Sequence, residues 1–248
     1  MVEALAAILA GVGAGMVNTI VGSGTLISFP TLLLLGHSPV SANVTNTVGL
    51  VPGSLSGAIG YRRELAGQAP RMLRLGLASA AGGLAGGAVL LIAPPEAFEL
   101  VVPLLLFGAV GLVAFQPRLR NLVGSRHGDQ GTIGVPLLAG TFATGVYGGY
   151  FGAAQGVILL SILAVLAHDS LQRLNALKNV LVAVVNGVAA ALFALIGPVD
   201  WTAVLFLAIG ATAGGQLGAH VGRRLPASVL RAAIMVVGTV TGLVLLLT

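Results

Sequence analysis

The amino-acid sequence predicts an all-α polytopic membrane protein with two inverted-topology repeats of about five helical segments each. Three observations support this prediction: an apolar composition, an internal repeat, and basic residues confined to a few loops. Hydrophobic residues make up 56% of the 248 residues and charged residues 8%, with a mean hydropathy of +1.02. Such a chain satisfies its backbone inside helices in lipid, and its long apolar runs lack the period-2 alternation of a membrane β-barrel.

The charge distribution argues against a nucleic-acid partner, although the net charge is +5. The positive residues lie in short clusters between apolar segments, which is the topology signal of membrane proteins. The absence of cysteine excludes disulfides and thiolate chemistry. The N-terminal stretch "MVEALAAILAG" has no basic n-region, so we interpret it as the first membrane segment and not as a signal peptide.

The second half of the chain resembles the first half in a constant register. When residue numbers are shifted by 132, Asn43 matches Asn175, Pro94 matches Pro226, and "GGLAG" at 82–86 matches "GGQLG" at 214–218. Matching glycines are common in this composition, but the Asn and Pro matches in one register are not. We predict a first transmembrane repeat at 1–115, a cytoplasmic linker at 116–132 and a second, inverted transmembrane repeat at 133–248.

Each repeat contains five apolar stretches, of which the second is short. A helix over 25–36 would be about 18 Å long, too short for a hydrocarbon core of about 30 Å. The chain break before it is therefore expected inside the membrane, so that the first two stretches form a broken or re-entrant hairpin. The predicted segments are 3–22, 25–36, 40–61, 72–93, 95–115, 133–152, 155–167, 172–196, 201–221 and 227–247.

Basic residues predict the orientation of these segments. Arginines follow the third stretch (Arg62, Arg63), occupy the linker (Arg118, Arg120) and recur near 223–231, and all three groups fall on one side if the helices alternate. That side should be cytoplasmic. The first repeat then starts outside and the second starts inside, an arrangement used by secondary transporters.

Two glycine-rich breaks are the first candidate site. "VGSGT" at 21–25 and "GGYFGAAQG" at 148–156 each precede a short segment at matching repeat positions. A break frees backbone N–H groups and directs the positive end of a helix into the membrane, where it can bind an anion. Ser23, Thr25 and Gln155 would add hydrogen-bond donors. The alternative is close helix packing through small residues.

A polar face on each third stretch is the second candidate site. Asn43, Thr47 and Ser54 share one side of a helix, with Asn46 beside them. Their repeat partners are Asn175, Asn179 and Asn186, with Lys178 beside them. Intramembrane polar groups tend to face the protein interior, where they either contact a substrate or bond between helices. Lys178 either attracts anions at the cytoplasmic mouth of a pathway or snorkels to the interface.

The acidic residues favour an anion as the transported ion. Every Asp and Glu lies near the end of an apolar stretch or in a loop. A cation pathway would normally contain a buried acid.

The first half resembles the first repeat of the sulfite exporter TauE/SafE family of membrane permeases. The resemblance rests on Gly22–Gly24, Pro30, "GHSPVSA" at 36–42, Thr45–Asn46 and Arg62–Arg63, and "GVYGGYFGAAQGVILLSILAVL" resembles the start of the second repeat. The sequence departs from the family pattern at "GAAQG", and at "ALKN", where Lys178 replaces a small polar residue. The resemblance implies export or exchange of sulfite or of organosulfonates such as sulfoacetate, with protons as a candidate coupling ion.

We therefore expect a secondary anion transporter working by alternating access in a bacterial cell inner membrane, with the lipid bilayer and a small anion as partners. The alternative is a passive anion channel built from two half-helices. An enzyme with Ser23 as nucleophile would need a base at membrane depth, so no enzyme activity, catalytic residue, metal or cofactor is predicted. A homodimer is one candidate assembly. The candidate substrate-binding residues are Asn18, Ser23, Gly24, Thr25, Asn43, Asn46, Thr47, Ser54, Tyr150, Gln155, Asn175, Lys178, Asn179 and Asn186.

Overall fold

The computed structural model describes residues 2–122, 133–167 and 169–221, and scattered positions between 232 and 245. None of the described residues lies in a strand, so the predicted all-α class is confirmed. The helices are α1 (Val2–Ile20), α2 (Thr25–Leu34), α3 (Pro39–Gly60), α4 (Ala69–Ile92), α5 (Pro95–Leu122), α6 (Val135–Tyr150), α7 (Gln155–Leu166), α8 (Leu171–Ile196) and α9 (Trp201–Val221).

Five of these helices, α1, α4, α5, α8 and α9, are long and apolar enough to cross a membrane. The chain is thus a multi-pass membrane protein. The short second segments are also present: α2 has 10 residues and α7 has 12. At about 1.5 Å per residue neither can cross the hydrocarbon core.

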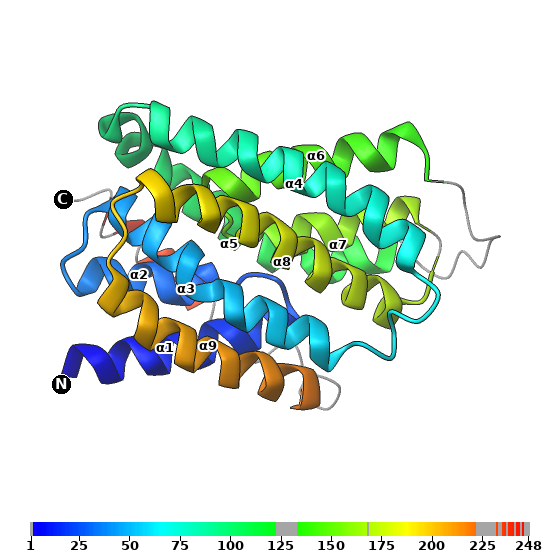
Figure 1. Ribbon diagram of the computed structural model, residues 1–248, viewed down its shortest axis with the longest axis horizontal. Coiled ribbons are helices and arrows are strands. Elements are labelled where there is room, and N and C mark those ends of the chain that lie inside the picture. The colour runs from blue at the N-terminus through cyan, green and yellow to red at the C-terminus, as the bar shows by residue number, and fades with distance from the viewer. Residues whose placement is uncertain are drawn as a thin grey trace.

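Two pairs of helices at corresponding positions of the two halves begin at matching residues. In the repeat register, Pro39 at the start of α3 matches Leu171 at the start of α8, and Ala69 of α4 matches Trp201 of α9. Figure 1 shows that α1 and α6, α3 and α8, and α4 and α9 run in opposite directions along the long axis. Inverted repeats require such an arrangement, although the inverted-repeat architecture itself stays a prediction.

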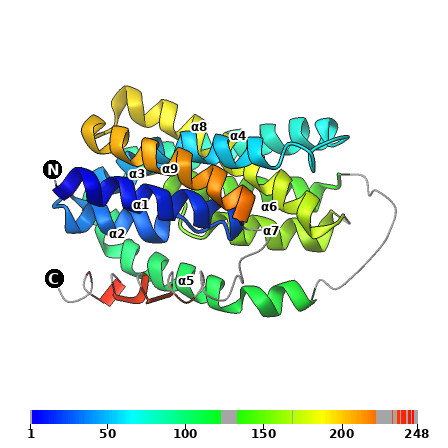
Figure 2. The same ribbon diagram turned by 90° about the horizontal axis from the view of Figure 1, so that it is seen from below.

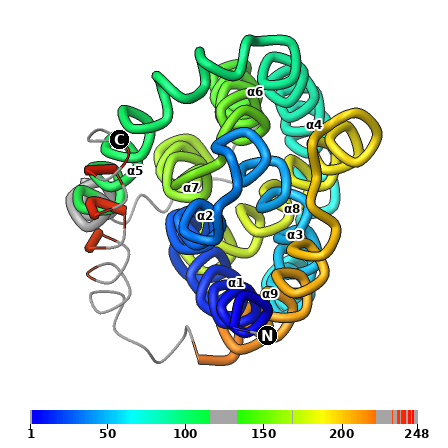
Figure 3. The backbone as a smooth tube through the Cα atoms, turned by 90° about the vertical axis from the view of Figure 1, so that its left-hand side faces the viewer, coloured from blue at the N-terminus to red at the C-terminus, as the bar shows by residue number. Residues whose placement is uncertain are grey.

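The outer helices of each half pack against helices of the other half. α1 packs along α9 of the other half, and α4 packs along α6. Viewed end-on, α2, α3, α7 and α8 lie between these two pairs (Figure 3). Gly82 faces the backbone of Phe142 on α6, and its counterpart Gly214 faces the backbone of Val12 on α1, each too close for any side chain. Small residues at such seams let membrane helices approach closely.

α5 lies along one side of this bundle (Figure 2). It continues to Leu122, so it includes the first part of the segment predicted as a linker, while 123–132 lie outside the described residues. The predicted last segment, 227–247, is described only at scattered helical positions between 232 and 245. Among these, Gly238 lies against Val110 and Gly242 against Phe107, both on α5.

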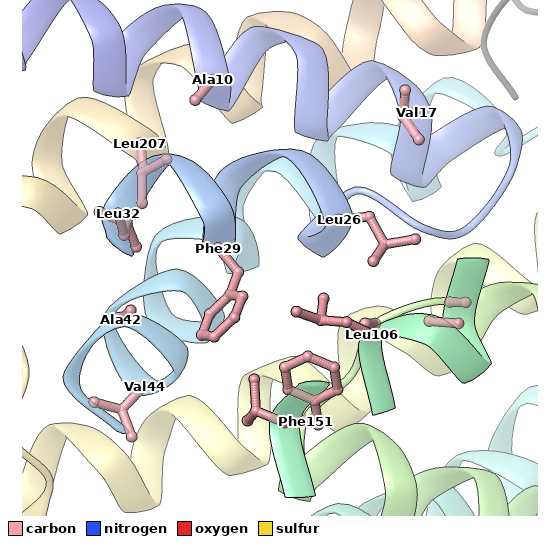
Figure 4. Packing of buried hydrophobic residues seen from close by; sticks show 14 of the residues in the cluster. Ala10, Val17, Leu26, Phe29, Leu32, Ala42, Val44, Leu106, Phe151 and Leu207 are labelled. Carbon is pink, nitrogen blue, oxygen red and sulfur yellow. The ribbon is translucent and has the colours of Figure 1, made fainter. Parts of the chain in front are cut away.

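An aromatic cluster fills the core beside the short helices. Phe29 of α2 meets Phe151 edge-to-face with ring centroids 5.4 Å apart, and Phe98 of α5 lies 6.0 Å from Phe151. Figure 4 shows Phe29, Phe151 and Leu106 converging from different parts of the chain. Edge-to-face aromatic pairs add to the area they bury. This cluster holds α2, α5 and the second chain break together.

Candidate anion site at two buried helix breaks

The first break separates α1 from α2. Val21–Gly24 leave the helical path and are buried, and Gly22 has a φ of +91° that favours glycine. Gly24, a candidate residue, packs against the backbone of Ala14 on α1. The chain therefore reverses inside the protein, and α2 starts there.

The second break separates α6 from α7 and is also largely buried. It contains Gly152, with a φ of +79°, and Ala154, the one described non-glycine residue with positive φ, at 57°. A left-handed alanine costs roughly 1–2 kcal/mol. Ala154 is the repeat counterpart of Gly22, so the second half keeps the left-handed turn with a side chain present.

The two breaks touch each other. The N–H of Gly156 donates a hydrogen bond of 2.9 Å to the carbonyl oxygen of Gly22. A Cβ atom on either glycine would lie 2.5 Å from the Cα of the other. Glycine at both positions thus brings the starts of α2 and α7 together. Neither residue was among the sequence-based candidates, although both belong to the quoted break motifs.

The starts of α2 and α7 meet at this contact, which we call the crossing, and each carries a buried side-chain donor. Neither α2 nor α7 has a side-chain N-cap. The side chains of Ser23 and Gln155 are 1% and 2% exposed, and Ser23 Oγ and Gln155 Nε2 have no hydrogen-bond partner within the described residues. These two residues occupy corresponding positions of the two repeats. The backbone N–H groups that start α7 already bond to the carbonyls of Gly152, Gly22 and Ala154. The features that would favour a bound anion are therefore the partial positive charge of the two buried helix ends and the two side-chain donors.

The polar side chains of α3 bond mainly to the two broken hairpins, α1–α2 and α6–α7. Asn43 donates to the carbonyl of Tyr150, at the end of α6, over 2.8 Å. Asn46 donates to Thr25 Oγ1 over 3.3 Å and accepts a bond from Ser28. Thr47 bonds to its own helix through the carbonyl of Asn43. Thr25, Asn46 and Thr47 are thus already satisfied, whereas Asn43 Oδ1 has no partner within the described residues.

The polar face of α8 bonds to the end of α1. Asn175 and Asn179 donate to the carbonyl of Thr19 over 3.4 and 3.3 Å. Lys178 Nζ donates to the carbonyls of Asn18 and Thr19 over 2.9 and 3.3 Å. Lys178 is 0% exposed, so it does not snorkel to the protein surface. The Oδ1 of Asn175 has no partner in the described part of the chain.

Ser54 and Asn186 meet between α3 and α8. Asn186 Nδ2 and Asn18 Nδ2 each donate to Ser54 Oγ over 3.2 Å. This three-way contact joins α1, α3 and α8. All candidate residues are buried except Asn18 and Tyr150, which are partly exposed. The structure therefore brings the candidates together around the breaks, with Ser23 and Gln155 as the donors left unused.

A separate groove of about 570 Å³ lies between α3 and α8 and contains none of the candidate residues. Its walls are almost entirely apolar, and Arg62 provides the charged group. A groove of this kind on a membrane protein suits acyl chains. It does not suit a small anion, which needs several polar donors.

The fold and this buried polar crossing define a multi-pass membrane transporter. The family model described as "Sulfite exporter TauE/SafE" matches residues 7–245. The chain belongs to this sulfite exporter family, and the resemblance noted from its motifs is confirmed.

Similar proteins carry the same general description. The "Probable membrane transporter protein YfcA" of Escherichia coli is 27% identical over 231 residues, covering 92% of this chain and 83% of that protein. The "Probable membrane transporter protein ORF9" of Sinorhizobium sp is 25% identical, covering 90% and 85%. A "Probable membrane transporter protein" of Haemophilus influenzae is 29% identical, covering 87% and 84%. No solved structure matches the chain.

Proposed function

We propose that the protein is a secondary transporter that exports or exchanges small sulfur-containing anions, such as sulfite or sulfoacetate, across a bacterial inner membrane. The substrate class follows from the family to which the chain belongs. The observation that carries the proposal is the contact between two buried helix N-termini, at which Ser23 Oγ and Gln155 Nε2 have no partner within the described residues.

The charges of the described residues favour an anion. Lys178 is the one charged side chain among the buried polar residues, and no described carboxylate is buried with it. A site for a cation would be expected to contain a buried acid. The crossing instead offers hydrogen-bond donors, positive helix ends and a nearby ammonium group.

Alternating access is the transport mechanism that we propose. Corresponding helices run in opposite directions (Figure 1), and the breaks lie between the two paired bundles of helices. A rigid-body movement of one of these bundles, α1 with α9, against the other, α4 with α6, would expose such a crossing first on one side and then on the other. Protons are the proposed coupling ion, and the arginine-rich end is proposed to face the cytoplasm.

Flux in proteoliposomes tests this function. Vesicles loaded with sulfite or sulfoacetate should show saturable efflux, with counterflow and a response to an imposed pH gradient. Saturable flux without counterflow would instead favour the passive channel. No flux of either anion from folded protein would remove this substrate class.

Substitutions of the two unused donors test the site. S23A and Q155L each remove a donor worth about 1.5–3 kcal/mol when it bonds a charged group, so the apparent affinity should fall by about 10- to 100-fold. S161A is a matched control, because the Ser161 hydroxyl bonds to the carbonyl of Val157 within α7. Unchanged affinity in folded S23A and Q155L would place the anion elsewhere.

A further inference from the structure

Lys178 is a buried cation without an acidic partner. It is the only lysine in the sequence and is 0% exposed. The ion pairs of the described residues do not include it. Its ammonium group bonds to two carbonyl oxygens instead. A buried charge is costly unless it is paired, so the site lacks one negative charge that a bound anion would supply.

The two carbonyls belong to the last turn of α1. This helix has no basic residue of its own in that turn. The C-terminal end of a helix carries about half a negative charge, and this end lies directly before Gly22 and Ser23. Uncompensated, it would repel an anion bound at the break. The ammonium of Lys178 offsets that partial charge from the neighbouring helix α8.

Among the described residues, the second half of the crossing has no such cation. The repeat counterpart of Lys178 is Asn46, which bonds to Ser28 and Thr25 within its own half. The end of α6 is bonded by the neutral amide of Asn43, through the carbonyl of Tyr150. Within the described residues, the electrostatic compensation is therefore confined to the first break.

We propose that Lys178 is a positioning residue that fixes the charge preference of the anion site. By offsetting the C-terminal end of α1, it gives the first break a net positive potential, so that anions with two negative charges bind more tightly than similar anions with one. This inference rests on the proposed function and adds the charge class of the substrate. Lys178 acts through the carbonyls of α1 and needs no direct contact with the anion.

Calorimetric binding to the purified protein in nanodiscs tests the role of Lys178. Sulfoacetate carries two negative charges at neutral pH, and ethanesulfonate carries one. In K178Q, which keeps a hydrogen-bond donor for α1, the affinity for sulfoacetate should fall by about tenfold or more. The affinity for ethanesulfonate should fall much less, so the ratio of the two affinities should collapse. K178R keeps the charge and should keep the ratio.

T19A is the matched control, because it removes a neutral hydroxyl that bonds to the carbonyl of Gly15 at the same end of α1. T19A should lower the thermal stability without changing the affinity ratio. An equal loss for both anions in K178Q, or loss of the ratio in folded K178R, would overturn the inference. If K178Q does not fold, K178M removes the same charge with an apolar side chain of similar length and should collapse the ratio in the same way; an unchanged ratio in folded K178M would overturn the inference. Failure of the wild type to bind either anion would instead contradict the proposed function.

Discussion

At each end of the molecule, a side chain at the start of one helix bonds to a backbone carbonyl at a corresponding position, but the side chain differs between the two ends. At one end, Arg173 Nη1 donates to the carbonyl of Ala66 over 3.0 Å. At the opposite end, Ser41 Oγ donates to the carbonyl of Pro198 over 2.9 Å. In the repeat register Ser41 matches Arg173, and Ala66 matches Pro198. Each contact joins the start of a polar helix, α8 or α3, to the loop before a helix of the other half, α4 or α9.

The chemistry around these two contacts differs. Asp169 bonds to Arg71 Nη1 over 2.9 Å and to Arg173 Nε over 3.0 Å, and its side chain is 15% exposed. Its counterpart His37 lies 3.9 Å from Asp200, whose side chain is 40% exposed. Partly buried, two-fold ion pairing contributes more than an exposed pair at this distance. The two ends thus share a backbone contact, whereas the strength of the ion pairing beside it depends on the local side chains.

Removal of the acidic charge at each end should give the largest difference in stability between the two ends. D169N leaves Arg71 and Arg173 without their counter-ion and should cost about 2–3 kcal/mol of unfolding free energy. D200N should cost less than about 1 kcal/mol, because asparagine can still accept the bonds that Asp200 takes from the N–H groups of Thr202 and Ala203. Thermal unfolding in detergent measures both. Equal losses would mean that the two ends are equivalent.

The sequence predicted the elements better than the contacts between them. The short helices 25–36 and 155–167 were expected within two residues of their observed ends, because hydropathy and glycine breaks are local signals. The predicted starts at 40 and 172 matched in the repeat register, as those of α3 and α8 do, whereas α4 begins at Ala69 and not at the predicted 72, and so matches α9 better than predicted. The contact of Gly22 with Gly156 was not foreseen, since it joins segments that are distant in the sequence.

The position of Lys178 shows a different limit of sequence reasoning. The sequence left Lys178 either at the cytoplasmic mouth of a pathway or snorkelling to the interface, because it could not reveal the end of α1 to which Lys178 bonds. Similarly, the sequence named Thr25, Asn46 and Thr47 as candidates, but Asn46 bonds to Thr25 and Ser28 of α2, and Thr47 bonds to its own helix. The partners of Asn46 and Lys178 come from other helices, and spacing along one helix cannot identify them.

The two ends should also differ in how strongly they restrict access to the first break. The chain has no cysteine, so S23C would carry the only thiol, placed at the first break. If the proposed alternating access operates, D169N should increase labelling of S23C by a membrane-impermeant maleimide from the arginine-rich side. D200N should increase labelling from the other side by less, because the weaker contact restrains that end less. Labelling changes on the same side for both variants would contradict this prediction.

Transplanting one end onto the other should give the smallest effect. The triple substitution H37D, S41R and D200Q installs, at the His37 end, the residues that occupy the corresponding positions 169, 173 and 68. D200Q is needed because H37D alone would place two carboxylates side by side. The new aspartate and arginine, four residues apart on one helix start, should pair as Asp169 and Arg173 do and add about 0.5 kcal/mol. D200Q also removes the bonds that Asp200 accepts from the N–H groups of Thr202 and Ala203, which costs about 1 kcal/mol, so the net change should be a loss of about 0.5 kcal/mol. The transplant supplies no equivalent of Arg71, because Ala203 occupies that position. Ala203 packs in the hydrophobic core, so an arginine there would overpack it and cannot complete the transplant. A much larger loss in the same thermal unfolding assay would show that the two backbone contacts are not interchangeable.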